Sequence, residues 1–188
     1  MTPKILAFAG SIRKESLNRQ ALDHAVRGAR EAGAEVTLIE LNDYSMPIYN
    51  GDLEESHGLP EAAVRLKGLF KSHHGLLIGC PEYNGSITPL LKNTLDWVSR
   101  PDGRESGLIP YLGKWAGLIA ASAGNLGGLR GLRHVREILT NLQVMVIPQQ
   151  MALSQADKSL NDPEASGLKG LHSVGKALAE SMKRWNPQ

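Results

Sequence analysis

Five short runs of apolar residues divide the chain at fairly regular intervals. They occupy residues 5–9, 36–41, 75–80, 114–122 and 144–147. Most of these runs are apolar at successive positions rather than at every second position, which is typical of strands buried on both faces. Strands of this kind occur in parallel sheets whose two faces are covered by helices.

Between these runs, apolar residues recur every three or four positions. This spacing predicts helices over residues 17–32, 60–72, 89–100, 129–142 and 168–184. Gly33 fits the position just after a helix, and Pro60 fits the first position of one. Residues 42–59 are polar and contain proline and glycine, so they predict a long loop. The alternation predicts a single α/β domain over residues 1–188, with a five-stranded parallel sheet between two layers of helices.

Composition limits the class of protein. The formal net charge of the 188-residue chain is +2, too small to indicate a nucleic-acid or membrane-surface partner. Cys80 is the single cysteine, so neither an intrachain disulfide nor a CxxC motif is possible. Residues 1–16 lack a secretory pattern, and no stretch approaches the roughly 18 apolar residues of a membrane span. We expect a cytoplasmic protein.

The loop after the first strand, "GSIRKESLN" (residues 10–18), is rich in hydrogen-bond donors. In a parallel sheet, ligands bind beyond the carboxyl ends of the strands, and the start of a helix favours an anion. Ser11 and Ser16 add hydroxyl groups, and Arg13 adds a permanent charge. These features predict a phosphate site. The alternative is that Ser16 only caps the helix and Arg13 is a solvated surface charge.

The loop after the third strand is "PEYNGSITP" (residues 81–89). Asn84-Gly85 is a turn dipeptide that leaves backbone N–H and C=O groups free for the edge of a flat heterocycle. Tyr83 could pack beside such a ring. The alternative is an ordinary turn before a helix.

Together these two stretches resemble the NADPH-dependent FMN reductase family of flavodoxin-like proteins. That family carries a G-S-x-R-x-x-S-x-N loop, matched here from Gly10 to Asn18. It also carries a P-E-Y-N-x-S-x-P-x-x-L-K-N-x-x-D-W block, matched from Pro81 to Trp97 with Thr88-Pro89 as a variant of the usual proline position. The resemblance implies a three-layer flavodoxin-like fold with FMN as cofactor and NADPH or NADH as electron donor.

The resemblance further implies ping-pong transfer to a small-molecule acceptor, such as a quinone, flavin, azo compound or metal ion. It implies a homodimer or homotetramer, with no nucleic-acid or membrane partner. The implied FMN-binding residues are Ser11, Arg13, Ser16, Leu17, Asn18, Pro81, Glu82, Tyr83, Asn84, Gly85, Ser122, Gly124 and Gly127. No catalytic acid or base and no metal ligand is implied. Arg100 and Arg104 could meet the phosphates of NAD(P)H, although a solvated face is the preferred interpretation.

Two alternative functions remain open. "AASAG" (residues 120–124) resembles a G-x-S-x-G nucleophile turn, with Asp157, Asp162 and His172 following Ser122 in the order of an α/β-hydrolase. That reading leaves the predicted phosphate site unused, and the chain is short for that fold. The second alternative is a non-enzymatic electron carrier or flavin sensor. The charge of +2 disfavours a carrier, because such proteins are usually strongly acidic.

Overall fold

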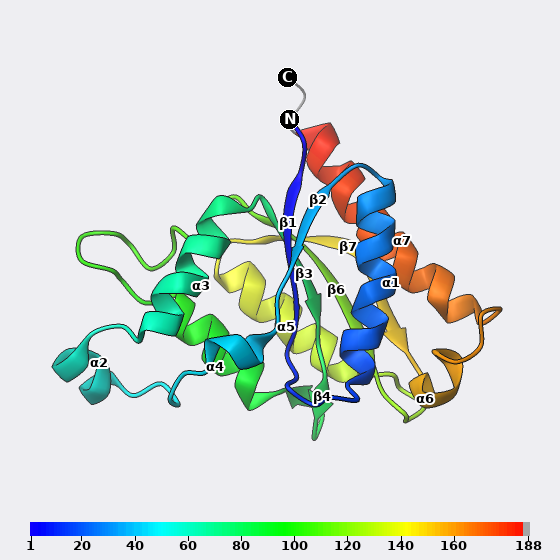
Figure 1. Cartoon of the computed structure of the whole chain (residues 1–188), viewed down its shortest axis with the longest axis horizontal. Coiled ribbons are helices and arrows are strands. Elements are labelled where there is room, and N and C mark those ends of the chain that lie inside the picture. Colours follow the sequence, from blue (N-terminus) through cyan, green and yellow to red (C-terminus); the bar gives the residue numbers. More distant parts are fainter. Residues whose placement is uncertain (186–188) are drawn as a thin grey trace.

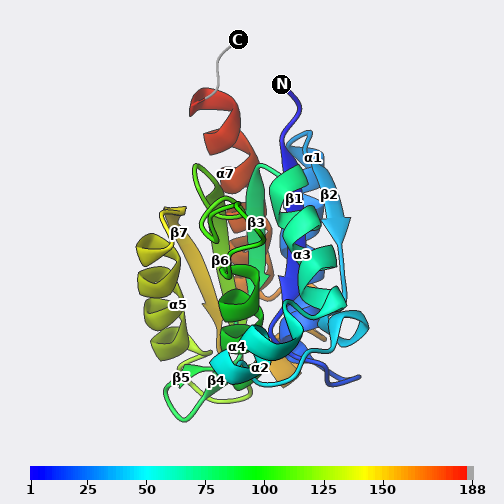
Figure 2. The ribbon, with the colours of Figure 1, turned by 90° about the vertical axis from the view of Figure 1, so that its left-hand side faces the viewer.

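The computed structural model describes residues 1–185, and a five-stranded parallel sheet lies at its centre. Its strands are β1 (Lys4–Ala9), β2 (Glu35–Leu38), β3 (Gly75–Gly79), β6 (Trp115–Ala121) and β7 (Met145–Leu153). Their order across the sheet is β2-β1-β3-β6-β7, which can be followed from right to left in Figure 2. The register aligns Ala9 of β1 with Gly79 of β3, and Gly79 with Ile119 of β6. The predicted five-stranded parallel sheet is confirmed.

Helices cover both faces of this sheet. One face carries α1 (Leu17–Glu31) and α7 (Ser166–Trp185), and the other carries α3 (Glu61–Ser72), α4 (Pro89–Val98) and α5 (Leu129–Asn141) (Figures 1 and 2). The side chains of β1 alternate between two hydrophobic cores. Ile5 and Ala7 belong to the core under α1 and α7, while Leu6 and Phe8 belong to the core under α3, α4 and α5. This alternation produces the predicted three layers.

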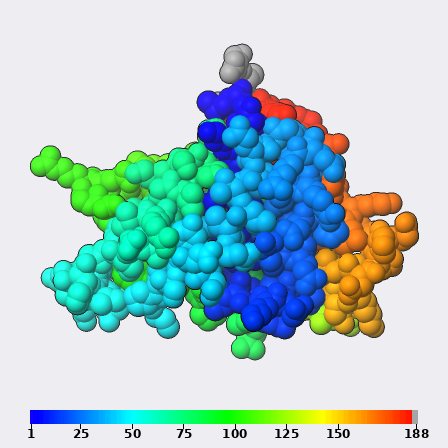
Figure 3. Space-filling view, in the orientation of Figure 1, coloured from blue at the N-terminus to red at the C-terminus, as the bar shows by residue number. Residues whose placement is uncertain are grey.

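The segment predicted as a long loop contains helical structure, so that prediction is wrong in part. A 3-10 helix, η1 (Leu41–Tyr44), follows β2, and α2 (Gly51–His57) comes next. The side chain of Asn50 caps α2 by accepting a hydrogen bond from the N–H of Asp52 at 2.9 Å. The sequence of α2 carries no apolar periodicity, because no residue of this helix is required to be buried, and the helix was therefore not predicted. Figure 3 shows this segment projecting from the body of the molecule, in cyan.

Other differences concern the ends of elements. Pro60 is the N-cap of α3 rather than its first residue, and β7 continues to Leu153, beyond the predicted end at residue 147. A short helix, α6 (Ala156–Ser159), follows β7. A small hairpin of β4 (Glu82–Tyr83) and β5 (Ser86–Ile87) lies within the loop after β3. Its two-residue strands are too short for a periodicity to predict.

The strand order positions the candidate site. In the sheet, β2 lies on one side of β1, and β3, β6 and β7 follow in that order on its other side. The chain therefore goes from β1 toward one edge of the sheet and then, from β3 onward, toward the other edge. The strand order therefore reverses between β1 and β3, and a crevice forms beyond their carboxyl ends. No helix within residues 1–185 has the length and apolarity to cross a bilayer.

Candidate functional site

A cavity of about 250 Å³ lies at the carboxyl ends of β1, β3 and β6, where the three predicted loops meet. Ser11, Arg13, Ser16, Leu17, Asn18, Pro81, Glu82, Tyr83, Ala121, Ser122 and Ala123 line it. Most of the residues predicted from sequence are therefore brought together. Asn84, Gly85, Gly124 and Gly127 are not among the lining residues.

The start of α1 presents donors and one cation at this cavity. The Oγ of Ser16 accepts a hydrogen bond from the N–H of Arg19 at 3.3 Å, so Ser16 is the N-cap of α1 and keeps its hydroxyl proton to donate. The first turn of α1 holds no acidic residue. Arg13 is exposed, and its guanidinium joins no ion pair within residues 1–185. The arrangement suits an anion, because the helix terminus and Arg13 both contribute positive charge.

Asn18 lines the cavity, but its amide is engaged by the end of β6. Its Nδ2 donates to the carbonyl of Ala121 at 2.8 Å, and its Oδ1 accepts from the N–H of the same residue at 3.0 Å. Both bonds are buried. Asn18 therefore holds the start of α1 against β6 and positions the donor-rich loop.

Gly10 and Thr88 join the first loop to the second. A Cβ on Gly10 would lie 2.9 Å from the Cβ of Leu91, so only glycine fits where the chain passes α4. The Oγ1 of Thr88 donates to the carbonyl of Gly10 at 2.8 Å and accepts from the N–H of Leu91 at 3.2 Å. Thr88 thus caps α4 and fixes the first loop beside it.

Glu82 is the acidic residue among those lining the cavity, and its charge is compensated. Its carboxylate accepts hydrogen bonds from the Nε of Arg130 at 2.8 Å and from the N–H of Gly131 at 3.0 Å. Burial acts to raise the pKa of Glu82, but the hydrogen bonds from Gly131 and Arg130 outweigh it, so the pKa lies below its ordinary value. Glu82 therefore anchors the β4–β5 hairpin to the start of α5.

The turn of that hairpin is formed by Asn84 and Gly85, which have φ angles of 51° and 83°. These left-handed conformations suit an Asn-Gly dipeptide, as the sequence predicts. The neighbouring Tyr83 lines the cavity and is 53% exposed, which leaves its ring free to contact a ligand.

The third loop contributes Ser122 to the cavity, while its glycines shape the backbone. The Oγ of Ser122 accepts a hydrogen bond from the N–H of Gly124 at 3.1 Å. Gly127 has a φ of +61°, and a Cβ there would lie 2.7 Å from the carbonyl carbon of Leu153. Gly127 therefore packs against the end of β7 in a conformation that favours glycine.

The hydrolase arrangement finds no support in the described residues. The Nε2 of His172 lies 2.8 Å from a carboxylate oxygen of Glu31, which places His172 at the contact between α7 and α1. No hydrogen bond joins Ser122 to His172 within residues 1–185. Cys80 is fully buried, and burial raises the pKa of its thiol far above the ordinary range, consistent with a packing role.

A second cluster, beside α2, was not predicted from sequence. The indole Nε1 of Trp97 donates to the carbonyl of Pro47 at 2.8 Å, and Asn93 bonds both to that carbonyl and to the N–H of Tyr49. The guanidinium of Arg100 pairs with Glu54 at 2.9 Å. The K-N-x-x-D-W part of the second motif thus attaches the α2 segment, and Arg100 is occupied there.

Comparisons with known proteins agree with this geometry. Residues 3–158 match the family model described as NADPH-dependent FMN reductase. An NAD(P)H-dependent FMN reductase of Pseudomonas aeruginosa is 34% identical, and the match covers 85% of each chain. A 2-hydroxy-1,4-benzoquinone reductase of Burkholderia is 32% identical over 86% of this chain and 84% of its own.

Among solved structures, the flavoenzyme NAD(P)H:(acceptor) oxidoreductase FerB from Paracoccus denitrificans has a TM-score of 0.77 at 24% identity. The match covers 97% of this chain and 98% of that one, which shows a common fold. The predicted flavodoxin-like fold and the predicted family are both confirmed. On the strength of the matched model and these relatives, the chain belongs to the NADPH-dependent FMN reductase family, whose enzymes use FMN with NAD(P)H as electron donor.

Proposed function

We propose that the cavity at the start of α1 binds the phosphate of FMN, and that the protein passes electrons from NAD(P)H through this cofactor to a small-molecule acceptor. One observation carries the proposal. Ser11, Arg13 and Ser16 converge at the N-terminus of a helix, at the point where the strand order reverses. This is where α/β sheets bind ligands, and the polarity suits an anion.

The donor set fits a phosphate monoester. Two hydroxyl groups, a guanidinium and the free N–H groups of a helix terminus are all donors to phosphate oxygens. The carboxylate of Glu82 is already paired with Arg130, so it leaves little uncompensated negative charge against the ligand. The cavity of about 250 Å³ is smaller than typical ligand pockets of roughly 300–1,000 Å³, so part of FMN would extend beyond it.

The residues of the candidate site would have separate roles in binding FMN. Ser11, Arg13 and Ser16 would hold the phosphate, and Asn18 would keep their loop in place. Tyr83 and the Asn84-Gly85 turn would contact the ring system of FMN. Ser122, from the loop after β6, would line the remaining side of the cavity. When bound, FMN supplies the two-electron transfer between donor and acceptor, and the protein contributes binding and electrostatics.

We also propose that NAD(P)H and the acceptor use the same opening in turn, which is a ping-pong order. Residues 1–188 would act as a single domain in the cytoplasm. A quinone is the favoured acceptor, because one relative at 32% identity is a 2-hydroxy-1,4-benzoquinone reductase.

Steady-state kinetics test this proposal. The purified, FMN-saturated protein should oxidise NADPH or NADH in the presence of 1,4-benzoquinone, with parallel lines in double-reciprocal plots at several quinone concentrations. Intersecting lines would contradict the ping-pong order. No oxidation of either nicotinamide nucleotide would contradict the enzymatic function and favour an electron carrier.

A further inference from the structure

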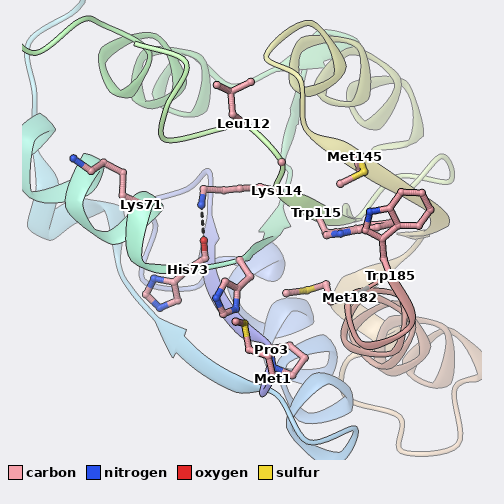
Figure 4. A pocket seen from close by; sticks show the side chains of 12 residues that line it. Met1, Pro3, Lys71, His73, Leu112, Lys114, Trp115, Met145, Met182 and Trp185 are labelled. Atoms are coloured by element: carbon pink, nitrogen blue, oxygen red, sulfur yellow. Dashed lines mark hydrogen bonds between the residues drawn. The ribbon is translucent and has the colours of Figure 1, made fainter. Parts of the chain in front are cut away.

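A second cavity lies at the opposite edge of the sheet, near the amino ends of the strands. It has a volume of about 380 Å³, and we call it the amino-edge cavity. Met1, Pro3, Lys71, His73, His74, Leu112, Gly113, Lys114, Trp115, Met145, Met182 and Trp185 line it (Figure 4). The strands β1, β3 and β6 separate it from the candidate FMN site, which lies at their carboxyl ends.

The lining combines an apolar surface with nitrogen bases. Trp115 and Trp185 meet edge to face, with ring centroids 6.0 Å apart, and the thioethers of Met145 and Met182 lie beside them. Lysine and histidine side chains occupy the other side, and none of the lining residues is acidic. A mostly apolar pocket with a few polar groups is typical of a site for a small organic molecule.

Lys114 is the central polar group of this cavity. It is only 6% exposed, and its ammonium donates one hydrogen bond, to the backbone carbonyl of His73, as Figure 4 shows. No carboxylate lies within 4 Å of its Nζ in residues 1–185. Burial lowers the pKa of Lys114 to about 8, so the amine is largely charged at neutral pH. A buried ammonium without a counterion is costly, and an anion would relieve that cost.

The other nitrogen bases divide into occupied and free groups. Both ring nitrogens of His73 are bonded, to the carbonyl of Leu69 and to the hydroxyl of Thr37. Lys71 pairs with Glu105 at 2.8 Å. In His74, Nδ1 accepts the N–H of Lys4 at 3.1 Å, which leaves the proton of the neutral ring on Nε2. Burial lowers the pKa of His74, and this favours the neutral ring. Among the lysine and histidine side chains that line the cavity in residues 1–185, Lys114 and His74 therefore keep a donor free for a ligand.

We propose that the amino-edge cavity binds a small organic carboxylate with a flat, apolar body. The carboxylate would take the place of the missing counterion beside Lys114, and the body would lie against Trp115 and Trp185. A doubly charged phosphate fits less well than a singly charged carboxylate, because the cavity lies at the carboxyl end of α3, where the negative end of the helix dipole opposes each added negative charge. Nothing in the proposed reductase function requires this site, so the two proposals stand independently.

Calorimetric titration of the FMN-saturated full chain tests the proposal with indole-3-acetate and its uncharged counterpart, indole-3-acetamide. We expect the acid to bind at least tenfold more tightly than the amide. Lys114→Met should remove this preference by weakening the acid alone, and Lys114→Arg should restore part of it. Lys176→Met, at an exposed lysine of α7 that pairs with Glu180 and does not line the cavity, is the matched control and should bind both probes as the wild type does. Equal affinity for acid and amide, or full binding of the acid by Lys114→Met, would overturn the proposal.

A second measurement needs no variant of Lys114. In NMR spectra of the wild-type protein, the indole N–H signals of Trp115 and Trp185 should shift when indole-3-acetate is added. The signal of Trp97 should stay in place, because that residue is fully buried with its indole N–H bonded to Pro47. Signals of Trp115 and Trp185 that do not move would contradict the proposed site.

Discussion

Asn18 joins two parts of the chain that lie 103 positions apart in the sequence. Its amide matches both backbone groups of Ala121, so the donor-rich loop is attached to β6 whether or not a ligand is present. The sequence predicts the residue type at this position but not this partner, because a contact between distant segments leaves no local pattern. The same limit applies to Gly10, where glycine is required because a side chain would collide with Leu91 of α4.

We predict that Asn18→Ala lowers the free energy of unfolding of the FMN-free protein by about 1–3 kcal/mol, because Ala121 would keep two buried, unpaired backbone groups. Urea unfolding measures this loss. Ser11→Ala is the control, since the Ser11 side chain accepts only the nearby N–H of Arg13. It should leave the stability of the FMN-free protein within about 0.5 kcal/mol and weaken FMN binding. Equal stability of Asn18→Ala and wild type would contradict the positioning role.

Glu82 makes a pH-dependent contribution to stability. Its pKa in the folded protein is below the ordinary value, so its contribution is complete at neutral pH and is lost as the pH falls below about 4.3. We predict that Glu82→Gln costs about 1–2 kcal/mol at pH 7 and reduces the loss of stability on acidification. Urea unfolding between pH 3 and pH 7 checks this. Glu105→Gln removes a more exposed pair with Lys71 and should cost less than about 1 kcal/mol. A cost for Glu82→Gln that is the same at pH 3 and pH 7 would refute the linkage.

Among the elements, α2 depends on contacts outside itself. None of its residues is buried, so it is held by the segment before it and by the ion pair between its Glu54 and Arg100. Asn93 of α4 accepts the N–H of Tyr49 at 2.8 Å and donates to the carbonyl of Pro47 at 2.9 Å. The buried indole of Trp97 reinforces this attachment.

Asn93→Ala should therefore release the segment before α2. We predict that the backbone N–H of Tyr49 exchanges with deuterium about tenfold faster in this variant, which corresponds to about 1.4 kcal/mol. Lys92→Ala, at the neighbouring position on the exposed face of α4, is the control and should leave that rate unchanged. Unchanged exchange in Asn93→Ala would show that other contacts hold the segment.

The elements that could be predicted are those with a strong apolar pattern. The runs in β1, β3 and β6 are buried along nearly their full length, and α1, α5 and α7 each present one apolar face. The α2 helix and the β4–β5 hairpin escape prediction because neither buries an apolar stripe. The candidate site was predictable for a different reason: its three loops follow three buried strands, so the sheet alone brings them together.

For the whole molecule, we propose a homodimer or homotetramer. Exposed apolar side chains occur in the loops before α1 and α5 and at the first position of α5: Ile12 is 58% exposed, Leu126 is 52% exposed and Leu129 is 44% exposed. A second copy packed on this surface would bury them and would place subunit contacts near the cofactor.

Light scattering coupled to size-exclusion chromatography tests this proposal. We expect a dimer or tetramer at micromolar concentration, and a shift toward monomer in Leu126→Glu. Val64→Glu, at an exposed apolar position of α3, is the control and should leave the mass unchanged. A monomeric wild-type protein would contradict the proposed assembly.

The most direct test of the account compares FMN with riboflavin, which lacks the phosphate. Dissociation constants are measured for the wild type, Arg13→Ala and Arg104→Ala, the last changing an exposed arginine that does not line the site. Arg13→Ala should weaken FMN by about 10- to 100-fold, because a charged hydrogen bond is lost, while riboflavin binding stays unchanged. Arg104→Ala should leave both affinities unchanged. If Arg13→Ala binds FMN as tightly as the wild type, or loses both ligands equally, the phosphate does not lie at the start of α1.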